Sequence, residues 1–65
     1  MLDEALEMLK ALKNGESIPE AEISEMVDEL TSQGKELEHE MKLSHLEAFE
    51  EKECWRIAGE LENYL

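Results

Sequence analysis

The sequence has few residues of the kinds that nucleic-acid-binding and membrane proteins need. Only six of its 65 residues are basic, against eighteen acidic ones, and the formal net charge is −12. This balance repels nucleic-acid phosphates and anionic membrane surfaces, so we expect no direct nucleic-acid partner and no membrane partner. No apolar run is longer than two residues, which is too short for a membrane span or a signal-peptide core. We therefore expect a cytoplasmic protein.

Cysteine is also scarce, and the chain is short. The single Cys54 rules out an internal disulfide and suits a reducing compartment, with a disulfide between two copies as the less favoured alternative. A half-buried structural role is the simpler interpretation of this residue. A chain of 65 residues forms one acidic helical domain, 1–65, which buries only about 60% of its unfolded surface. Self-association is therefore expected.

Strand signals are nearly absent, because the chain has no alternating β-branched run and is rich in Glu, Leu, Lys, Met and Ala. The sequence predicts an all-α fold, a small helical bundle of three helices at about 2 to 13, 18 to 32 and 35 to 63. The first two would form a helical hairpin against one long C-terminal helix, in a coiled coil-like arrangement completed by dimerisation.

Local signals place the first two helices. Leucines at positions 2, 6, 9 and 12 form one stripe, and Asn14-Gly15 follows as a stop signal, because both residues tolerate the left-handed conformation. The stretch 17-SIPE-20 predicts a capping box in which Ser17 and Glu20 satisfy each other's backbone amides. It would start the second helix.

The sequence allows two interpretations of Gly34, a turn or a continuous helix. The stretch Thr31-Ser32-Gln33-Gly34 has the order expected at a helix end, which favours a turn there. The opposing signal is an apolar register that starts at Ile23 and keeps alternating four- and three-residue steps through Gly34 to Ala58. We expect the turn, with one long rod as the alternative.

The third helix is expected to have two apolar faces. One carries Leu37, Met41, Ala48 and Trp55. The other is our predicted protein-interaction site, buried by a second copy, and consists of Leu43, Leu46, Ile57, Leu61 and Tyr64. An alternative is that 44-SHLE-47 is itself a capping box, with Leu43 packed against Ala48, so that the helix restarts there.

Residues able to do chemistry do not converge. His39 and His45 are six residues apart and lie on different helix faces, and Glu36 with His39 or Glu50 with Cys54 lack further ligands. We expect no metal site, no cofactor, no catalytic residue and no small-molecule substrate, and hence no enzyme. The lone Trp55 is expected in the core, with a partner-facing role as the alternative.

Three functions fit these features. The favoured one is a small acidic protein-interaction module, an adaptor or regulator that acts through helix-helix contacts as a homodimer and binds another protein. The second is a phage-type inhibitor whose carboxylates imitate nucleic acid and block a basic protein cleft. The third is a bare oligomerisation or designed helical module.

Overall fold

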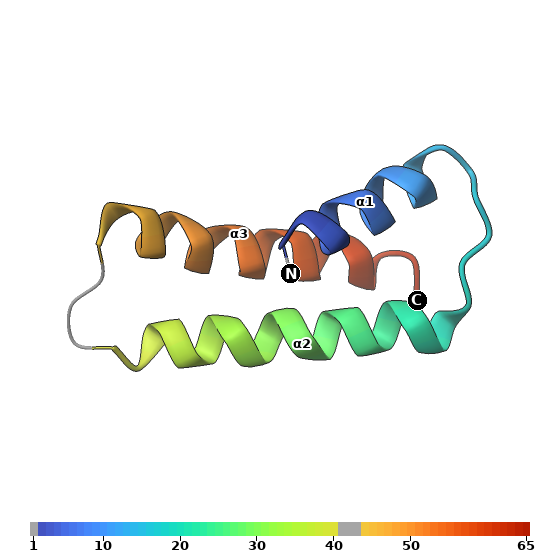
Figure 1. The fold of residues 1–65 in the computed structure, drawn as a ribbon. Coiled ribbons are helices and arrows are strands. Elements are labelled where there is room, and N and C mark those ends of the chain that lie inside the picture. Colours follow the sequence, from blue (N-terminus) through green and yellow to red (C-terminus); the bar gives the residue numbers. More distant parts are fainter. Residues whose placement is uncertain (1, 41–43) are drawn as a thin grey trace.

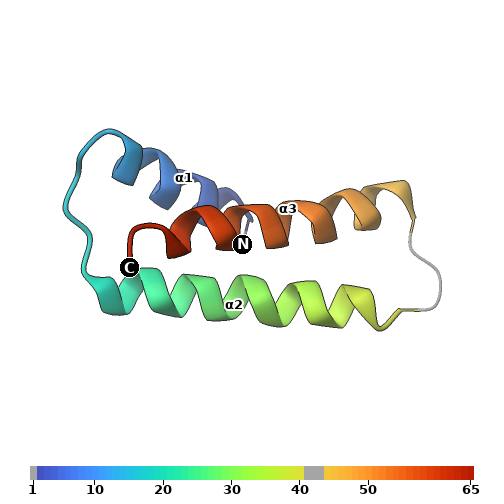
Figure 2. The same ribbon diagram turned by 180° about the vertical axis from the view of Figure 1, so that it is seen from behind.

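Three α-helices build the molecule in the computed structural model, which describes residues 2–40 and 44–65. They are α1 (Leu2–Lys13), α2 (Glu20–Glu38) and α3 (His45–Glu62), and the described residues contain no strand. The predicted all-α class and helix count are confirmed. Helices α2 and α3 lie antiparallel along their length, and α1 packs over the C-terminal half of α3 (Figures 1 and 2). The body measures 39 × 18 × 16 Å.

The end of α1 confirms the predicted stop at Asn14-Gly15. Gly15 has a φ of +86°, the left-handed conformation that closes a helix. Its amide donates to the Leu12 carbonyl at 3.0 Å, and the Glu16 amide donates to the Ala11 carbonyl at 3.0 Å. These two bonds are the Schellman pattern, so the chain leaves α1 with its last carbonyls satisfied.

The start of α2 differs from the expectation, since the capping box predicted at Ser17 and Glu20 does not form. The N-cap of α2 is Pro19, with φ −56° and ψ 138°, and no side chain caps the helix. A residue that precedes proline resists the helical conformation, so Ile18 cannot be the first helical residue after a Ser17 cap. Ile18 instead packs against the core as a half-buried side chain.

Helix α2 runs straight through Gly34, so the expected turn there and the bounds 18 to 32 are wrong. Gly34 is buried and its φ is not positive. A methyl group at this position would lie 2.8 Å from both Cε2 and Cζ2 of Trp55, because the indole ring lies directly over it. Glycine is therefore suited to this site by the close approach of an aromatic ring and not by a chain reversal.

The break comes instead before α3, where the alternative capping box is found. The Glu47 amide donates to the Ser44 hydroxyl at 3.1 Å, and the Ser44 amide donates to a Glu47 carboxylate oxygen at 3.4 Å. The single helix expected over 35 to 63 is thus divided, and α3 is 18 residues long. The staple proposed for Leu43 lies outside the described residues.

The core lies where the three helices meet. The predicted register of α2 is confirmed in part, since its seam residues are buried: Ile23, Val27, Leu30, Gly34 and Leu37. The other buried apolar residues are Ala5, Leu9, Met26, Cys54, Ile57, Ala58 and Leu61. Because α3 folds back on α2, its late face becomes core within one chain.

Candidate protein-interaction surface

The five residues predicted as an interaction site are not brought together on the surface. Ile57 and Leu61 are fully buried inside the single chain, and Leu43 lies outside the described residues. Leu46 is exposed near the start of α3 and Tyr64 beyond its end. The physical reason is the break before Ser44, which lets α3 reverse and turn its late apolar face towards α1 and α2.

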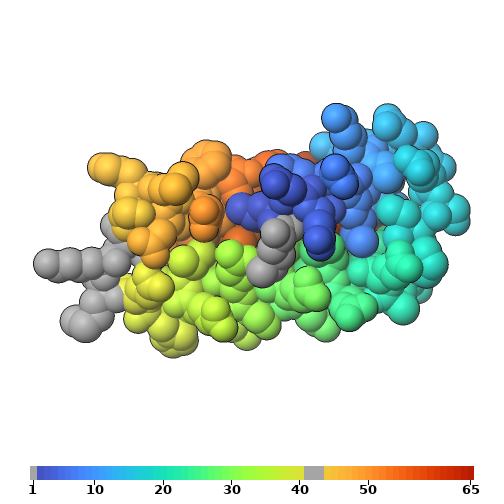
Figure 3. Space-filling model, viewed as in Figure 1, coloured from blue at the N-terminus to red at the C-terminus, as the bar shows by residue number. Residues whose placement is uncertain are grey.

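A different apolar surface is exposed between α1 and α3. Helix α1 has 12 residues against 18 in α3, so the first turns of α3 extend beyond the part that α1 covers (Figure 3). There Leu46 is 67% exposed and Phe49 is 60% exposed, and on α1 Leu6 is 43% exposed. We call this surface, with the half-buried Leu2, the α1–α3 face.

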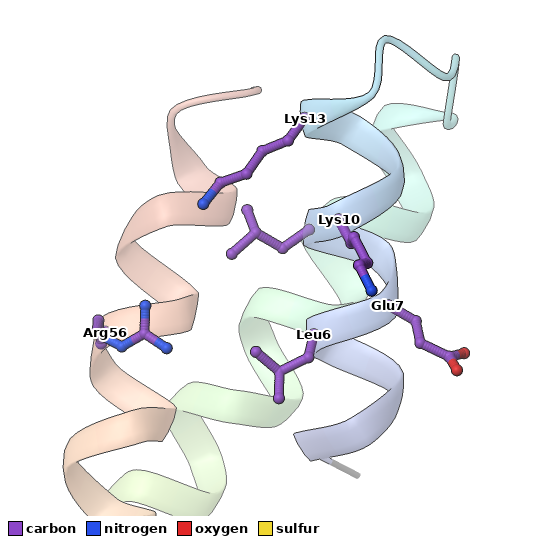
Figure 4. Close-up of a pocket in the computed structure, with 6 residues that line it drawn as sticks. Leu6, Glu7, Lys10, Lys13 and Arg56 are labelled. Atoms are coloured by element: carbon purple, nitrogen blue, oxygen red, sulfur yellow. The ribbon is translucent and has the colours of Figure 1, made fainter.

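Two adjoining hollows shape this face. The first has a volume of about 360 Å³, and its apolar lining includes Leu2, Leu6, Leu46 and Phe49. The second has a volume of about 380 Å³ and is lined by Leu6, Glu7, Leu9, Lys10, Lys13 and Arg56 (Figure 4). Leu6 and Arg56 line both, so the hollows are neighbours along the groove between the helices.

The second hollow gathers positive charge in an acidic protein. Three of the six basic residues line it: Lys10, Lys13 and Arg56. The Arg56 guanidinium pairs with Glu53 at 2.6 Å and with Glu60 at 2.7 Å, and Lys13 approaches Glu60 at 3.6 Å. Hydrogen bonds from Arg56 lower the pKa of Glu53. These pairs hold Arg56 at the wall that the two hollows share.

The groove between α1 and α2 has the opposite character. A hollow of about 260 Å³ there is lined by two methionines, Met8 and Met26, and by four glutamates, Glu4, Glu22, Glu25 and Glu29. No basic side chain lines it. This groove holds four of the eighteen acidic residues, but an acidic cluster does not by itself identify a ligand.

Possible metal ligands do not converge in the described part of the chain. Among residues 2–40 and 44–65, no three His, Cys, Asp or Glu side chains are placed to hold a metal ion. Cys54 is fully buried, and burial, followed by the charges of nearby glutamates, raises the pKa of its thiol. Such a cysteine is a poor nucleophile. Within the same residues, no helix has the length and apolar character to cross a membrane.

Phe49 and Leu6 are the surface residues that the sequence reasoning missed. Phe49 follows Leu46 by three residues, a spacing that places both on one side of a helix, and this signal could have found it. The sequence predicts Leu6 in the apolar stripe of α1 that faces the core. That stripe is wider than the surface that α2 and α3 cover, so Leu6 remains exposed. No protein-family model, no curated protein and no solved structure matches the chain.

Proposed function

We propose that the protein is a small acidic interaction module, an adaptor or regulator that binds another polypeptide helix through its α1–α3 face and performs no catalysis. The observation that carries the proposal is the exposure of Leu46 and Phe49 beside Leu6 on a domain whose remaining surface is mostly acidic. Isolated apolar side chains on a surface need no explanation. Apolar side chains that gather around connected hollows are typical of interaction sites.

The energetics support an apolar contact at this face. Burying a side chain such as phenylalanine or leucine contributes about 1.5 to 3 kcal/mol before the costs of association are subtracted. Aromatic residues at the centre of an interface often dominate its affinity. Phe49 is the most exposed aromatic residue of the described chain, so it is the side chain whose loss should weaken binding most.

Affinity capture with matched variants tests the proposal. The wild type, Phe49→Glu and the control Leu65→Glu would be used to retain proteins from cells that carry this protein. Leu65 is also exposed, but it lies at the C-terminus, outside the α1–α3 face. A retained polypeptide would then be identified, purified and titrated by calorimetry. We expect the wild type and Leu65→Glu to bind it alike and Phe49→Glu to bind at least tenfold more weakly.

Equal binding by all three proteins would contradict the proposal. Salt separates it from the inhibitor that imitates nucleic acid. An apolar helix contact should hardly respond to ionic strength, whereas a basic partner held by the glutamates of the α1–α2 groove should be released steeply as salt rises.

A further inference from the structure

We infer that the polypeptide received by the α1–α3 face is a second copy of this chain, docked about a twofold axis. This inference rests on the proposed function and names its partner. In this arrangement Phe49 of each copy enters the 380 Å³ hollow of the other. The contact is made twice, because in a twofold interface a residue that contacts a second residue of the partner is itself matched by the reverse contact.

The shape of the surface supports a second copy, because the exposed Phe49 side chain and the second hollow lie on the same face. Phe49 and Arg56 are seven residues apart on α3, which is about two turns or roughly 10 Å along one side of the helix. A cavity of about 150 Å³ holds a benzene ring, so the second hollow has room for a phenyl side chain. Leu9 is buried beneath the hollow and Leu6 forms part of its wall. A phenyl ring would therefore meet apolar side chains there.

Charge supports the same partner and sets its direction. Asp3 and Glu50 line the hollow beside Phe49. The hollow that would receive it is lined by three basic residues, Lys10, Lys13 and Arg56, and by one acidic residue, Glu7. A twofold rotation places the acidic end of one copy against the basic end of the other. Lys10 makes no ion pair with any described residue, and it faces the partner's Glu50 in this arrangement. This face therefore complements itself in charge, although the whole molecule is strongly negative.

The long side of the molecule is large enough to hold a specific interface. It measures 39 Å by 18 Å, a projected area of roughly 700 Å², which is of the same order as the roughly 800 Å² that each partner buries in a standard interface. Because Phe49 and the hollow that receives it are on one face, each copy in a dimer fills the hollow of the other. The assembly closes as a dimer and leaves no free end for growth.

Charge reversal tests the docking through a rescue. In a dimer of Glu50→Lys, the new lysine of each copy would face Lys10 of the other copy. In a dimer of Lys10→Glu, the new glutamate of each copy would face Glu50 of the other copy. Each variant alone should dimerise about tenfold more weakly than the wild type, since two rim pairs become repulsive. An equimolar mixture of the two variants restores both pairs, so sedimentation velocity should recover the wild-type dimer. Circular dichroism would confirm that each variant is folded.

The control pair carries the same charge changes on the exposed side of α2. Lys35→Glu and Glu36→Lys should each dimerise like the wild type to within about threefold, and their mixture should show no gain. A wild-type dimer without rescue in the Lys10→Glu and Glu50→Lys mixture would overturn the docking and leave the interaction function standing. A wild type that stays monomeric at high concentration would overturn the inference altogether, and the capture experiment would still test the proposed function separately.

Discussion

At the scale of single residues, the contact between Gly34 and Trp55 joins the two long helices. The indole lies over the bare backbone of Gly34, and its Nε1 donates to a Glu51 carboxylate oxygen at 3.2 Å. Trp55 is 37% exposed, yet its ring contacts α2 at Gly34 and its own helix α3 at Glu51. The absence of a side chain at Gly34 therefore lets α2 and α3 approach closely.

Replacing Gly34 by alanine should be much less favourable than the same change at Gly59. A methyl group at Gly59 meets nothing within 4 Å, so Gly59→Ala should stabilise the protein by about 0.5 to 1 kcal/mol through helix propensity. Gly34→Ala should lose that gain, because Trp55 must move away from the new methyl group. Urea unfolding would measure both, and tryptophan emission should shift to longer wavelength in Gly34→Ala only. Equal stabilisation with unchanged emission would show that the ring is not packed there.

Two carboxyl groups near the link between α2 and α3 should titrate as a pair. Hydrogen bonding and charge from Glu47 raise the pKa of Glu40, while a hydrogen bond from Glu40, together with those from Ser44, lowers the pKa of Glu47. Because the pKa of Glu40 is raised on folding, this group stabilises the folded state at low pH, and that contribution is lost as the pH rises through its raised pKa. Because the pKa of Glu47 is lowered on folding, this group stabilises the folded state above the ordinary glutamate pKa, and that contribution is lost as the pH falls through its lowered pKa.

Glu40→Ala should move the pKa of Glu47 part of the way back towards the ordinary value. The return is incomplete because the hydrogen bonds that the Glu47 carboxylate accepts from Ser44 remain. Carbon-detected NMR titration of the side-chain carboxyl would measure it, with Glu36→Ala on the exposed side of α2 as the control. A Glu47 pKa that is the same in the wild type and in Glu40→Ala would show that the two groups do not interact.

At the scale of the elements, two stretches of the form Ser-x-x-Glu behave differently. Both 17-SIPE-20 and 44-SHLE-47 match the capping-box pattern, but only the second forms it. The proline in the first stretch explains the difference, because the residue before a proline resists the helical conformation; Ile18 lies outside the helix and the N-cap is Pro19. The start of α3 is therefore fixed by its own side chains, and that of α2 by proline and packing.

Ser44→Ala should therefore destabilise the protein, and Ser17→Ala should have almost no effect. Loss of an N-cap hydroxyl costs about 1 kcal/mol, a large fraction of the stability of a small domain. Ser17 makes no cap bond, so its loss should change the free energy of unfolding by only a few tenths of a kcal/mol. Chemical denaturation compares them directly. Equal costs for the two variants would contradict this account of both helix starts.

Two local signals in the sequence predicted the structure correctly. The end of α1 follows from Asn14-Gly15, and the buried side of α2 follows from its apolar spacing. The passage of α2 through Gly34 could not be predicted, because its cause is Trp55, which lies 21 residues further along the chain. The order Thr-Ser-Gln-Gly is typical of a helix end unless a tertiary contact gives the glycine another role.

At the scale of the whole molecule, the short α1 determines what remains exposed. Helices α2 and α3 extend beyond it (Figure 1). The apolar side chains at the start of α3, Leu46 and Phe49, are therefore exposed. Of the predicted interaction residues, Leu46 belongs to this face, while Ile57 and Leu61 close the core. Which apolar residues face outward depends on where the chain reverses, and the spacing of leucines alone does not specify that.

The molar mass in solution tests the central claim most directly. Light scattering over a micromolar concentration series should give a mass near twice the 7.5 kDa of one chain for the wild type and for Leu65→Ala. Phe49→Ala should give a mass near 7.5 kDa, because the variant loses the phenyl ring that would contact Leu6 and Leu9 in the hollow of the other copy and leaves every charge unchanged. A wild-type mass of 7.5 kDa at every concentration, or a dimer that Phe49→Ala leaves intact, would contradict the account.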